Sequence, residues 1–328
     1  MYGKMKGHLT HVSYFLSGAN RQAYLDGHIE LVPNVFHEMP KILRQSTHLS
    51  AVLAVVSPID EHGYFSLGTQ AEYISPLIGK VPFYVEVNEH MPRTFGSNQI
   101  HISQVKGYVE HHEPLIEVPE PRIREADLQI ADFIAERVRD GDTLQIGIGS
   151  IPNAVTHKLK HHRSLGLHSE LISDGIVDLV KAGVIDGSAK MTNRGKLIGT
   201  FALGTERLHQ FLHHNPVIEL LPVDIVNHPM EIAKEDNIVS INATTEVDFY
   251  GQCASETIGG TYYSSTGGQA DFVRAVHFAK RGRGYICMHS TAKNGEVSRI
   301  MPHLTKGSVV TTSKNDVDHI VTEYGAAK

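Results

Sequence analysis

Residues 143–162, TLQIGIGSIPNAVTHKLKHH, carry the strongest signal for the fold of this chain. The first four read as a buried strand, Gly147 to Gly149 as a glycine loop, and residues 151–162 as a helix. The glycines allow a tight backbone turn, and Pro152 suits the first turn of a helix, where its missing N–H costs nothing. The pattern therefore predicts a strand that leads directly into a helix, which is the repeating unit of a parallel sheet.

The same alternation of strands and helices extends in both directions from this segment. Upstream, residues 50–56 and 81–87 read as buried strands and residues 36–46 as a short helix. Downstream the alternation continues to the end of the chain, with residues 218–226 and 307–313 among the expected strands. The sequence therefore predicts an α/β fold with mainly parallel sheets whose faces are covered by helices.

The length and a proline-rich stretch together suggest two domains. The 328 residues correspond to about two domains at roughly 150 residues each. Residues 113–122, EPLIEVPEPR, contain three prolines and are the best candidate for a linker. We expect an N-terminal domain over residues 1–118 and a C-terminal domain over residues 122–328.

Composition excludes several classes of protein. The net charge of −6, from 30 basic and 36 acidic residues, gives no electrostatic footprint for nucleic acid. Cys253 and Cys287 form no disulfide framework and match no zinc-ligand spacing. Residues 1–11 lack the apolar stretch of a secretory signal, and no apolar run approaches the ~20 residues that span a bilayer. We expect a cytoplasmic protein without a membrane or nucleic-acid partner.

The glycine loop by itself leaves three interpretations open: a phosphate or thioester site, a simple tight turn, or a dinucleotide site. The start of the helix would present free N–H groups to an anion. A dinucleotide fingerprint has a third glycine where this chain has Pro152, although Glu170 stands at about the spacing of its acidic residue. Glu170 by itself also fits a solvated strand end.

Four short motifs, taken in order, narrow these interpretations. They are GIGSIPNAV (147–155), HSELISDG (168–175), VNHP (226–229) and GGQADF (267–272). Together they resemble the acetyl-CoA hydrolase/CoA-transferase family, and most closely its 4-hydroxybutyrate and butyrate CoA-transferase branch. The likeness covers nearly the whole chain and implies the NagB/RpiA/CoA-transferase-like fold, with the site in the cleft between the two domains.

The resemblance also implies a mechanism. The family uses a glutamate nucleophile, which Glu170 matches, and moves CoA through a glutamyl-CoA thioester with ping-pong kinetics. A carboxylate with an ordinary pKa is ionised at pH 7 without assistance. The family places oxyanion donors in both glycine loops and on an asparagine, and it places CoA contacts on a lysine and a threonine. The matching positions are Gly147, Ile148, Gly149, Ser150, Ile151, Gly267, Gly268, Asn227, Lys293 and Thr245.

The function implied is transfer of CoA between 4-hydroxybutyryl-CoA or butyryl-CoA and acetate. CoA is then a substrate, and neither a cofactor nor a metal is required. The partners are acyl-CoA and short-chain carboxylates, and the family suggests a homo-oligomer. Acyl-CoA hydrolysis at the same site, a nucleotide-binding oxidoreductase and a non-catalytic relative remain alternatives.

Several residues compete for these roles. Glu246, in the strand-like text ATTEVD, is the main rival nucleophile, whereas Cys253 has no recognisable base near it. Histidine pairs four residues apart suggest a metal site, but their polar surroundings favour surface positions; they are His157 with His161 and His209 with His213. Relatives carry further chain before the position of Met1 and after VTEYG. We therefore expect a first domain without its opening units.

Overall fold

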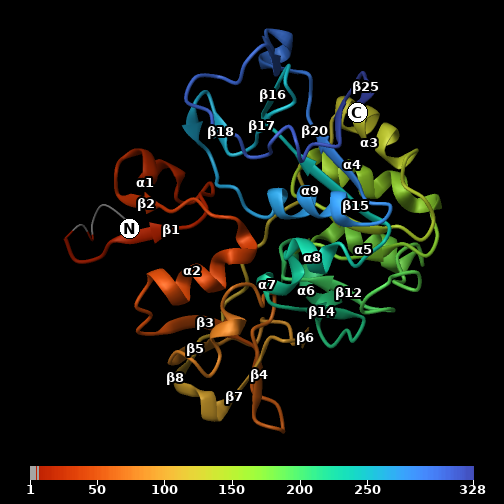
Figure 1. The fold of residues 1–328 in the computed structure, drawn as a ribbon. Helices are drawn as coiled ribbons and strands as arrows, with labels where there is room; N and C mark the ends of the chain where they lie inside the picture. The colour runs from red at the N-terminus through yellow and green to blue at the C-terminus, as the bar shows by residue number, and fades with distance from the viewer. Residues whose placement is uncertain (1–4, 6) are drawn as a thin grey trace.

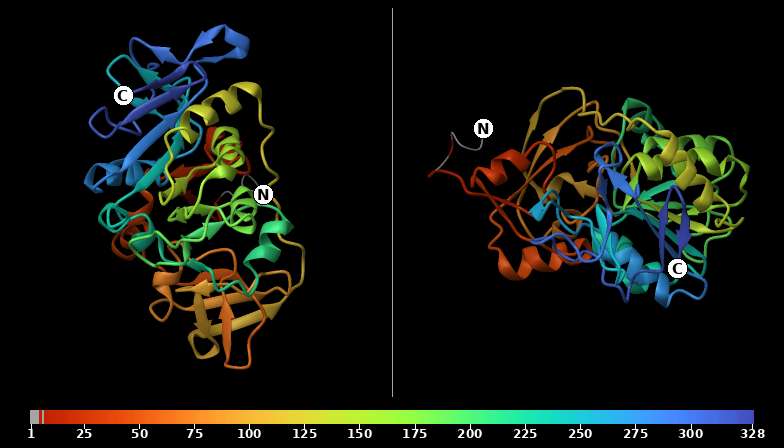
Figure 2. Two further views of the ribbon diagram at one scale, coloured as in Figure 1. Left: turned by 90° about the vertical axis from the view of Figure 1, so that its right-hand side faces the viewer. Right: turned by 90° about the horizontal axis from the view of Figure 1, so that it is seen from above.

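The computed structural model describes residue 5 and residues 7–328. Residues 1–4 and 6, which belong to the N-terminal stretch that lacks a signal pattern, lie outside the described part. The red and orange N-terminal elements occupy one side of the molecule, and the yellow-green to blue elements occupy the other (Figure 1). The view from above shows the same division, with the red and orange elements mainly on the left and the green and blue elements mainly on the right (Figure 2).

A six-stranded sheet organises the larger part. Its strands run in the order β10-β9-β15-β20-β24-β25, and every neighbouring pair is parallel except β24 with β25. The strands are β9 (Thr143–Ile146), β10 (Gly166–Leu167), β15 (Ile238–Ala243), β20 (Arg283–Cys287), β24 (His319–Thr322) and β25 (Gly325–Ala327). The predicted mainly parallel sheet is thus confirmed.

Helices cover both faces of this sheet. The helices of this part are α3 (Glu125–Ala135), α4 (Ser150–Lys158), α5 (Asp174–Lys181), α6 (Glu206–Leu212), α7 (Val223–Val226), α8 (Pro229–Ile232) and α9 (Gln269–Phe278). Val239 and Ile241 of β15 share a core with α3 and α4, whereas the alternate residue Ile238 packs with Phe272 of α9. Successive strand side chains point to opposite faces, so α3 and α4 lie on one side and α9 on the other.

The N-terminal part has its own core and sheet. Strands β3 (Val52–Val56), β5 (Phe83–Val87) and β8 (Val105–Glu110) form a parallel sheet, with α2 (Met39–Ser46) packed in the same core. Residues 111–124, which contain the proline-rich linker, form no helix or strand. The division at residues 118 and 122 stays a prediction.

Short elements complete the chain. They are α1 (Arg21–Leu25), β1 (His11–Ser13), β2 (Ile29–Leu31), β4 (Tyr64–Ser66), β6 (Phe95–Gly96), β7 (Gln99–His101), β11 (Leu171–Ile172), β12 (Leu197–Gly199), β13 (Phe201–Ala202), β14 (Ile218–Leu220), β16 (Glu246–Asp248), β17 (Cys253–Ala254), β18 (Thr257–Ile258), β19 (Thr261–Tyr262), β21 (Thr291–Ala292), β22 (Val297–Ser298) and β23 (Ile300–Met301).

Two expected strands differ from the structure: one is only partly formed, and the other is reduced to an isolated bridge. Residues 218–226 begin as β14 but continue as the helix α7, because Pro222 ends the strand and stands at the helix start. Residues 307–313 form only an isolated bridge between Thr312 and Cys253, although their β-branched residues resemble a strand.

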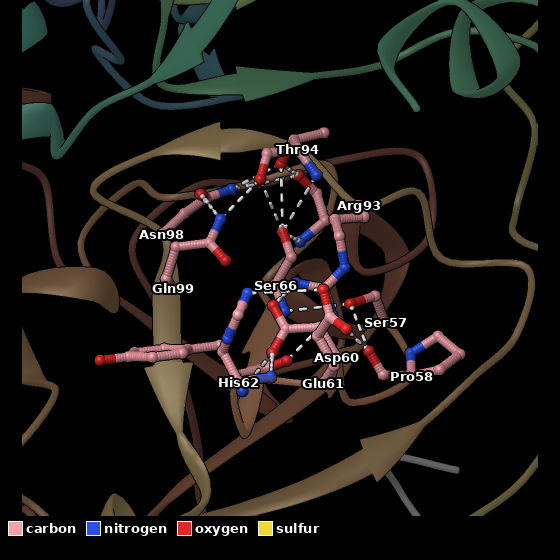
Figure 3. A network of polar contacts seen from close by, with 12 residues as sticks. Ser57, Pro58, Asp60, Glu61, His62, Ser66, Arg93, Thr94, Asn98 and Gln99 are labelled. Carbon is pink, nitrogen blue, oxygen red and sulfur yellow. Dashed lines mark hydrogen bonds and ion pairs between the residues drawn. The ribbon is translucent and has the colours of Figure 1, made fainter. Parts of the chain in front are cut away.

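A polar network fixes the loop that leads from β3 towards the site (Figure 3). The Arg93 guanidinium donates to Asp60 Oδ2 at 3.0 Å and to the carbonyl oxygen of Pro58 at 2.6 Å. Further along, Thr94 Oγ1 donates to the carbonyl oxygen of Gly68 at 2.6 Å. These contacts hold residues 58–68, in the segment that follows β3, against Arg93 and Thr94.

The two parts touch directly beside the second glycine loop. The N–H of Phe36 donates to the carbonyl oxygen of Gly267 at 3.1 Å. On the same side, the Arg21 guanidinium lies 3.4 Å from the centre of the Tyr263 ring. Within the described residues, no helix is long and apolar enough to cross a membrane.

Candidate active site

The site lies at the carboxyl ends of parallel strands. The glycine loop follows β9, Thr244 and Thr245 follow β15, and Glu170 follows β10. Neighbouring parallel strands end at one edge of a sheet, and ligands of open α/β sheets bind at that edge. The topology therefore brings together segments that are about a hundred residues apart in sequence.

Glu170 is held between an asparagine and the second glycine loop. Asn227 Nδ2 donates to Glu170 Oε2 at 2.6 Å. A Cβ on Gly268 would stand 1.8 Å from the same oxygen, so only glycine leaves room for this carboxyl. Three of the four predicted motifs thus meet at one carboxyl group.

The environment of Glu170 changes its acidity. Burial, together with the nearby carboxyls of Asp271 and Glu72, raises the pKa of Glu170 to about 8, although the Asn227 hydrogen bond opposes the shift. The expectation that this carboxyl is ionised at pH 7 without assistance therefore does not hold in this structure. The reason is that an apolar pocket with two other acids disfavours a third negative charge.

This shift predicts how stability depends on pH. Between the ordinary pKa of 4.5 and about 8, the folded protein keeps a proton on Glu170 that the unfolded chain has released. The stabilisation is complete below pH 4.5 and is lost as the pH rises through 8. Glu170→Gln lacks this loss. We therefore expect its free energy of unfolding near pH 9 to exceed that of the wild type by about 1–3 kcal/mol. This range is smaller than the full pKa shift would give, because the side chain is only partly buried.

Thermal unfolding of both proteins from about pH 5 to pH 9 measures the effect. Groups that the two proteins share cancel in the difference between their melting temperatures. A difference that does not grow with pH would contradict the raised pKa of Glu170.

A chain of polar contacts leads from Asn227 through Asp271 to His37. Asp271, on the first turn of α9, lies in contact with Asn227 and raises the pKa of Glu170. Its Oδ1 stands 2.7 Å from His37 Nδ1, and its Oδ2 accepts from the His37 N–H at 3.3 Å. His37 belongs to the N-terminal part, so this contact links that part to the helix beside Glu170.

The first glycine loop uses one of its backbone N–H groups within the sheet. The N–H of Gly147 already donates to the carbonyl oxygen of Ile241 at 2.9 Å and continues the sheet. Gly149 has a φ of 134°, a conformation that only glycine adopts easily, and Ser150 Oγ donates to Asp127 at 3.0 Å. The N–H groups available to a ligand therefore lie after Gly147, at the start of α4.

Two cavities meet at Glu170. The first, which we call the sheet-side cavity, has a volume of about 410 Å³ and is lined by the glycine loop, Thr244, Thr245 and residues 263–269. The second, the N-terminal cavity, has about 370 Å³ and is lined mainly by residues 11–15, Asn34, Phe36, Met39, Glu72 and Phe201. Four residues line both cavities: Phe15, Ile148, Glu170 and Gly267. Glu170 is thus accessible from two sides.

A third, basic hollow adjoins the start of α4. It has a volume of about 910 Å³ and is lined by residues 149–152 together with Arg122, Arg124, His289 and Arg299. It shares Ala243 and Thr244 with the sheet-side cavity. The two hollows therefore meet beside the first glycine loop.

Three other predicted residues lie in different surroundings. Thr245 lines the sheet-side cavity, but its hydroxyl donates to the carbonyl oxygen of Thr257 at 2.8 Å and its N–H donates to the carbonyl oxygen of Ala254 at 3.0 Å. Ile151, in the first turn of α4, is buried and lines the basic hollow. Lys293 is exposed at the turn between β21 and β22. Among the described residues, it is not one of those that line the three hollows.

The rival residues lie in surroundings that do not favour the roles considered for them. Glu246 is buried in β16 and accepts from the Thr305 N–H at 3.1 Å and from the Thr305 hydroxyl at 2.7 Å. Cys253 is buried, and burial raises the pKa of its thiol to about 12. His157 and His161 are exposed.

Sequence reasoning did not single out Asp271, His37 or Glu72. Asp271 stands inside the quoted motif GGQADF, so its place beside Gly268 was available as a signal. His37 and Glu72 lie in ordinary helix and loop text, far in sequence from the residues that they meet. No local pattern marks them.

Comparison with known proteins identifies the family of the chain. Residues 2–119 match the acetyl-CoA hydrolase/transferase N-terminal domain, and residues 204–328 match the C-terminal domain of that family. The chain is 49% identical to succinyl-CoA:cyclohexane-1-carboxylate CoA transferase of Geobacter metallireducens, over 98% of this chain and 74% of that protein. It is 42% identical to 4-hydroxybutyrate coenzyme A transferase of Clostridium kluyveri, over 98% of this chain and 76% of that protein.

A solved structure gives the same result for the fold. RipA from Yersinia pestis superposes with a TM-score of 0.92 at 41% identity, covering 97% of this chain and 74% of that one. The predicted fold class and the predicted family are both confirmed. The chain therefore belongs to the acetyl-CoA hydrolase/transferase family and is a CoA-transferase of that family.

Proposed function

We propose that this chain transfers CoA from a short-chain acyl-CoA, butyryl-CoA or 4-hydroxybutyryl-CoA, to acetate through a thioester on Glu170. The observation that carries the proposal is that Glu170 stands where two cavities meet. One cavity can hold the thiol arm of CoA while the other holds the acyl group. A carboxyl that both can reach is able to exchange one for the other.

The first half-reaction forms the enzyme thioester in two steps. A Glu170 carboxylate oxygen attacks the thioester carbonyl, the C–S bond breaks, and CoA thiolate leaves an acyl-glutamyl anhydride. The thiolate then attacks the Glu170 carbonyl carbon and expels the acyl group as a free carboxylate. Acetate reverses the two steps, so one thioester replaces another and no external energy source is consumed.

Each step develops an oxyanion that needs hydrogen-bond donors. For the acyl carbonyl we propose the N–H groups after Gly147 and those at the start of α9, because Ile148 and Gly267 in these two loops line both cavities. For the glutamyl carbonyl we propose Asn227 Nδ2, which already stands 2.6 Å from Glu170 Oε2. One such donor contributes roughly 2.7–4 kcal/mol to the transition state.

The residues that line the three hollows support an assignment of the pantetheine arm, the phosphates and the acyl group of acyl-CoA. We propose that the pantetheine arm follows the sheet-side cavity past Thr245, and that the phosphates lie towards Arg122, Arg124 and Arg299 in the basic hollow. Guanidinium groups and helix N-termini are the partners that phosphates favour. The acyl group is then left to the N-terminal cavity.

Trapping the intermediate tests the proposal. The protein is incubated with acetyl-CoA, butyryl-CoA or succinyl-CoA, the last being the donor named for the Geobacter relative. Borohydride then reduces any glutamyl thioester, and mass spectrometry of a digest locates the changed residue. We expect reduction at Glu170, and the same result in a Glu246→Gln variant.

The assignment of Glu170 as the nucleophile would be contradicted if borohydride reduced Glu246 instead. It would also be contradicted if no residue were reduced in a sample that transfers CoA to acetate. Release of CoA at equal rates with and without acetate would instead indicate hydrolysis at this site.

A further inference from the structure

The N-terminal cavity contains a second carboxyl group besides Glu170. Glu72 lines the cavity, and no other described side chain forms a hydrogen bond or ion pair with its carboxyl. Glu72 and Glu170 line the same cavity, and the charge of Glu72 contributes to the raised pKa of Glu170. An acid in this place needs an explanation, because burying an unpaired carboxyl is costly.

The backbone presents Glu72 to the cavity in an unusual conformation. Its φ is 41°, in the left-handed region that side chains other than glycine seldom adopt. The N–H of Glu72 donates to the carbonyl oxygen of Thr200 at 3.2 Å, and its carbonyl oxygen accepts from the N–H of Val223 at 3.0 Å. The C-terminal part therefore holds this residue of the N-terminal part in position, which is typical of a functional site.

The rest of the lining combines apolar side chains with the polar side chains of His11, Ser13, Tyr14, Asn34 and Tyr73. The apolar members are Val12, Phe15, Phe36, Met39, Ile148 and Phe201. Among the described residues that line the cavity, the titratable ones are His11, Tyr14, Tyr73, Glu72 and Glu170, and none is lysine or arginine.

We propose that Glu72 selects the acyl group: the N-terminal cavity accepts monocarboxylates and rejects acyl groups with a second carboxylate at the far end. The inference rests on the proposed function, because it assigns the acyl group to this cavity. A distal carboxylate would be buried in this lining without a guanidinium or ammonium partner. It would also meet the like charge of Glu72.

An uncharged or hydroxylated chain avoids both costs. Its apolar carbons contact the aromatic and aliphatic lining, and a terminal hydroxyl can donate to the Glu72 carboxylate. Burial raises the pKa of Glu72 to about 7, so an assay near pH 8 examines its ionised form.

The test compares acceptors in the second half-reaction. Wild type, Glu72→Gln and the exposed control Glu61→Gln are loaded with CoA from acetyl-CoA, and kcat/KM is measured for butyrate and for succinate. Glutamine keeps the size and backbone of Glu72 and removes only its charge. We expect the wild type to prefer butyrate by about tenfold or more, and Glu72→Gln to reduce that preference about tenfold by gaining activity with succinate. Glu61→Gln should keep the wild-type preference.

Binding without chemistry provides an independent measurement. Ligand-observed NMR of butyrate and succinate with each protein reports the same selectivity in the absence of CoA. Failure of acetyl-CoA to form a thioester on Glu170 would overturn the proposed function. The preference for butyrate over succinate measured by NMR would still decide the role of Glu72. An unchanged preference in Glu72→Gln, equal losses for both acceptors, or a wild type that prefers succinate would each overturn the selectivity proposal.

Discussion

Glu170→Gln is expected to lower kcat for CoA transfer by about 10⁴-fold or more, because the amide cannot form the anhydride. The fold should persist. The amide oxygen of the introduced glutamine would still accept from Asn227 Nδ2, at the position where Glu170 Oε2 now accepts at 2.6 Å. The measurement is acetate-dependent turnover of butyryl-CoA, with circular dichroism to verify the fold.

Two controls make this result specific. Glu61→Gln makes the same chemical change on a side chain that is 86% exposed, and we expect it to leave turnover within about twofold of wild type. Glu170→Ala should be as inactive as Glu170→Gln, because both lack the nucleophile. Retention of more than a few per cent of the activity in Glu170→Gln would contradict a covalent role for this carboxyl.

Gly268→Ala is the second change from which we expect a large loss. The added Cβ would lie 1.8 Å from Glu170 Oε2 and 2.3 Å from Asn227 Nδ2. The backbone φ of −97° suits alanine, so the clash affects the side chains rather than the turn. The Glu170 carboxyl must move by about an ångström and weaken its bond to Asn227. Displacements of that size cost about 10²-fold in rate, and we expect kcat/KM to fall by that amount.

Gly18→Ala is the matched control for this prediction. A Cβ on Gly18 meets no atom within 4 Å. Steady-state kinetics of the two variants should therefore differ by about two orders of magnitude, with similar melting temperatures. Wild-type kinetics in Gly268→Ala would show that the carboxyl does not need its present position.

The elements around the site were predictable because their signals are local. Apolar runs set β3, β5 and β9, and the glycines with Pro152 set the transition into α4. The errors arose where two local preferences compete: residues 223–226 are rich in β-branched side chains, but Pro222 starts a helix there. Thr312 has strand-like neighbours but pairs only as an isolated bridge.

The sequence by itself determined the family, the alternation of strands and helices, and the candidacy of Glu170, because motifs and periodicity are properties of neighbouring residues. Only the tertiary structure decided what surrounds that carboxyl. Asn227 and Gly268 approach it from separate elements, Glu72 lines the same cavity, and burial together with the carboxyls of Asp271 and Glu72 raises its pKa. The physical reason is that desolvation and like-charge repulsion depend on distances through space. Chain topology sets those distances, and no local stretch of sequence records them.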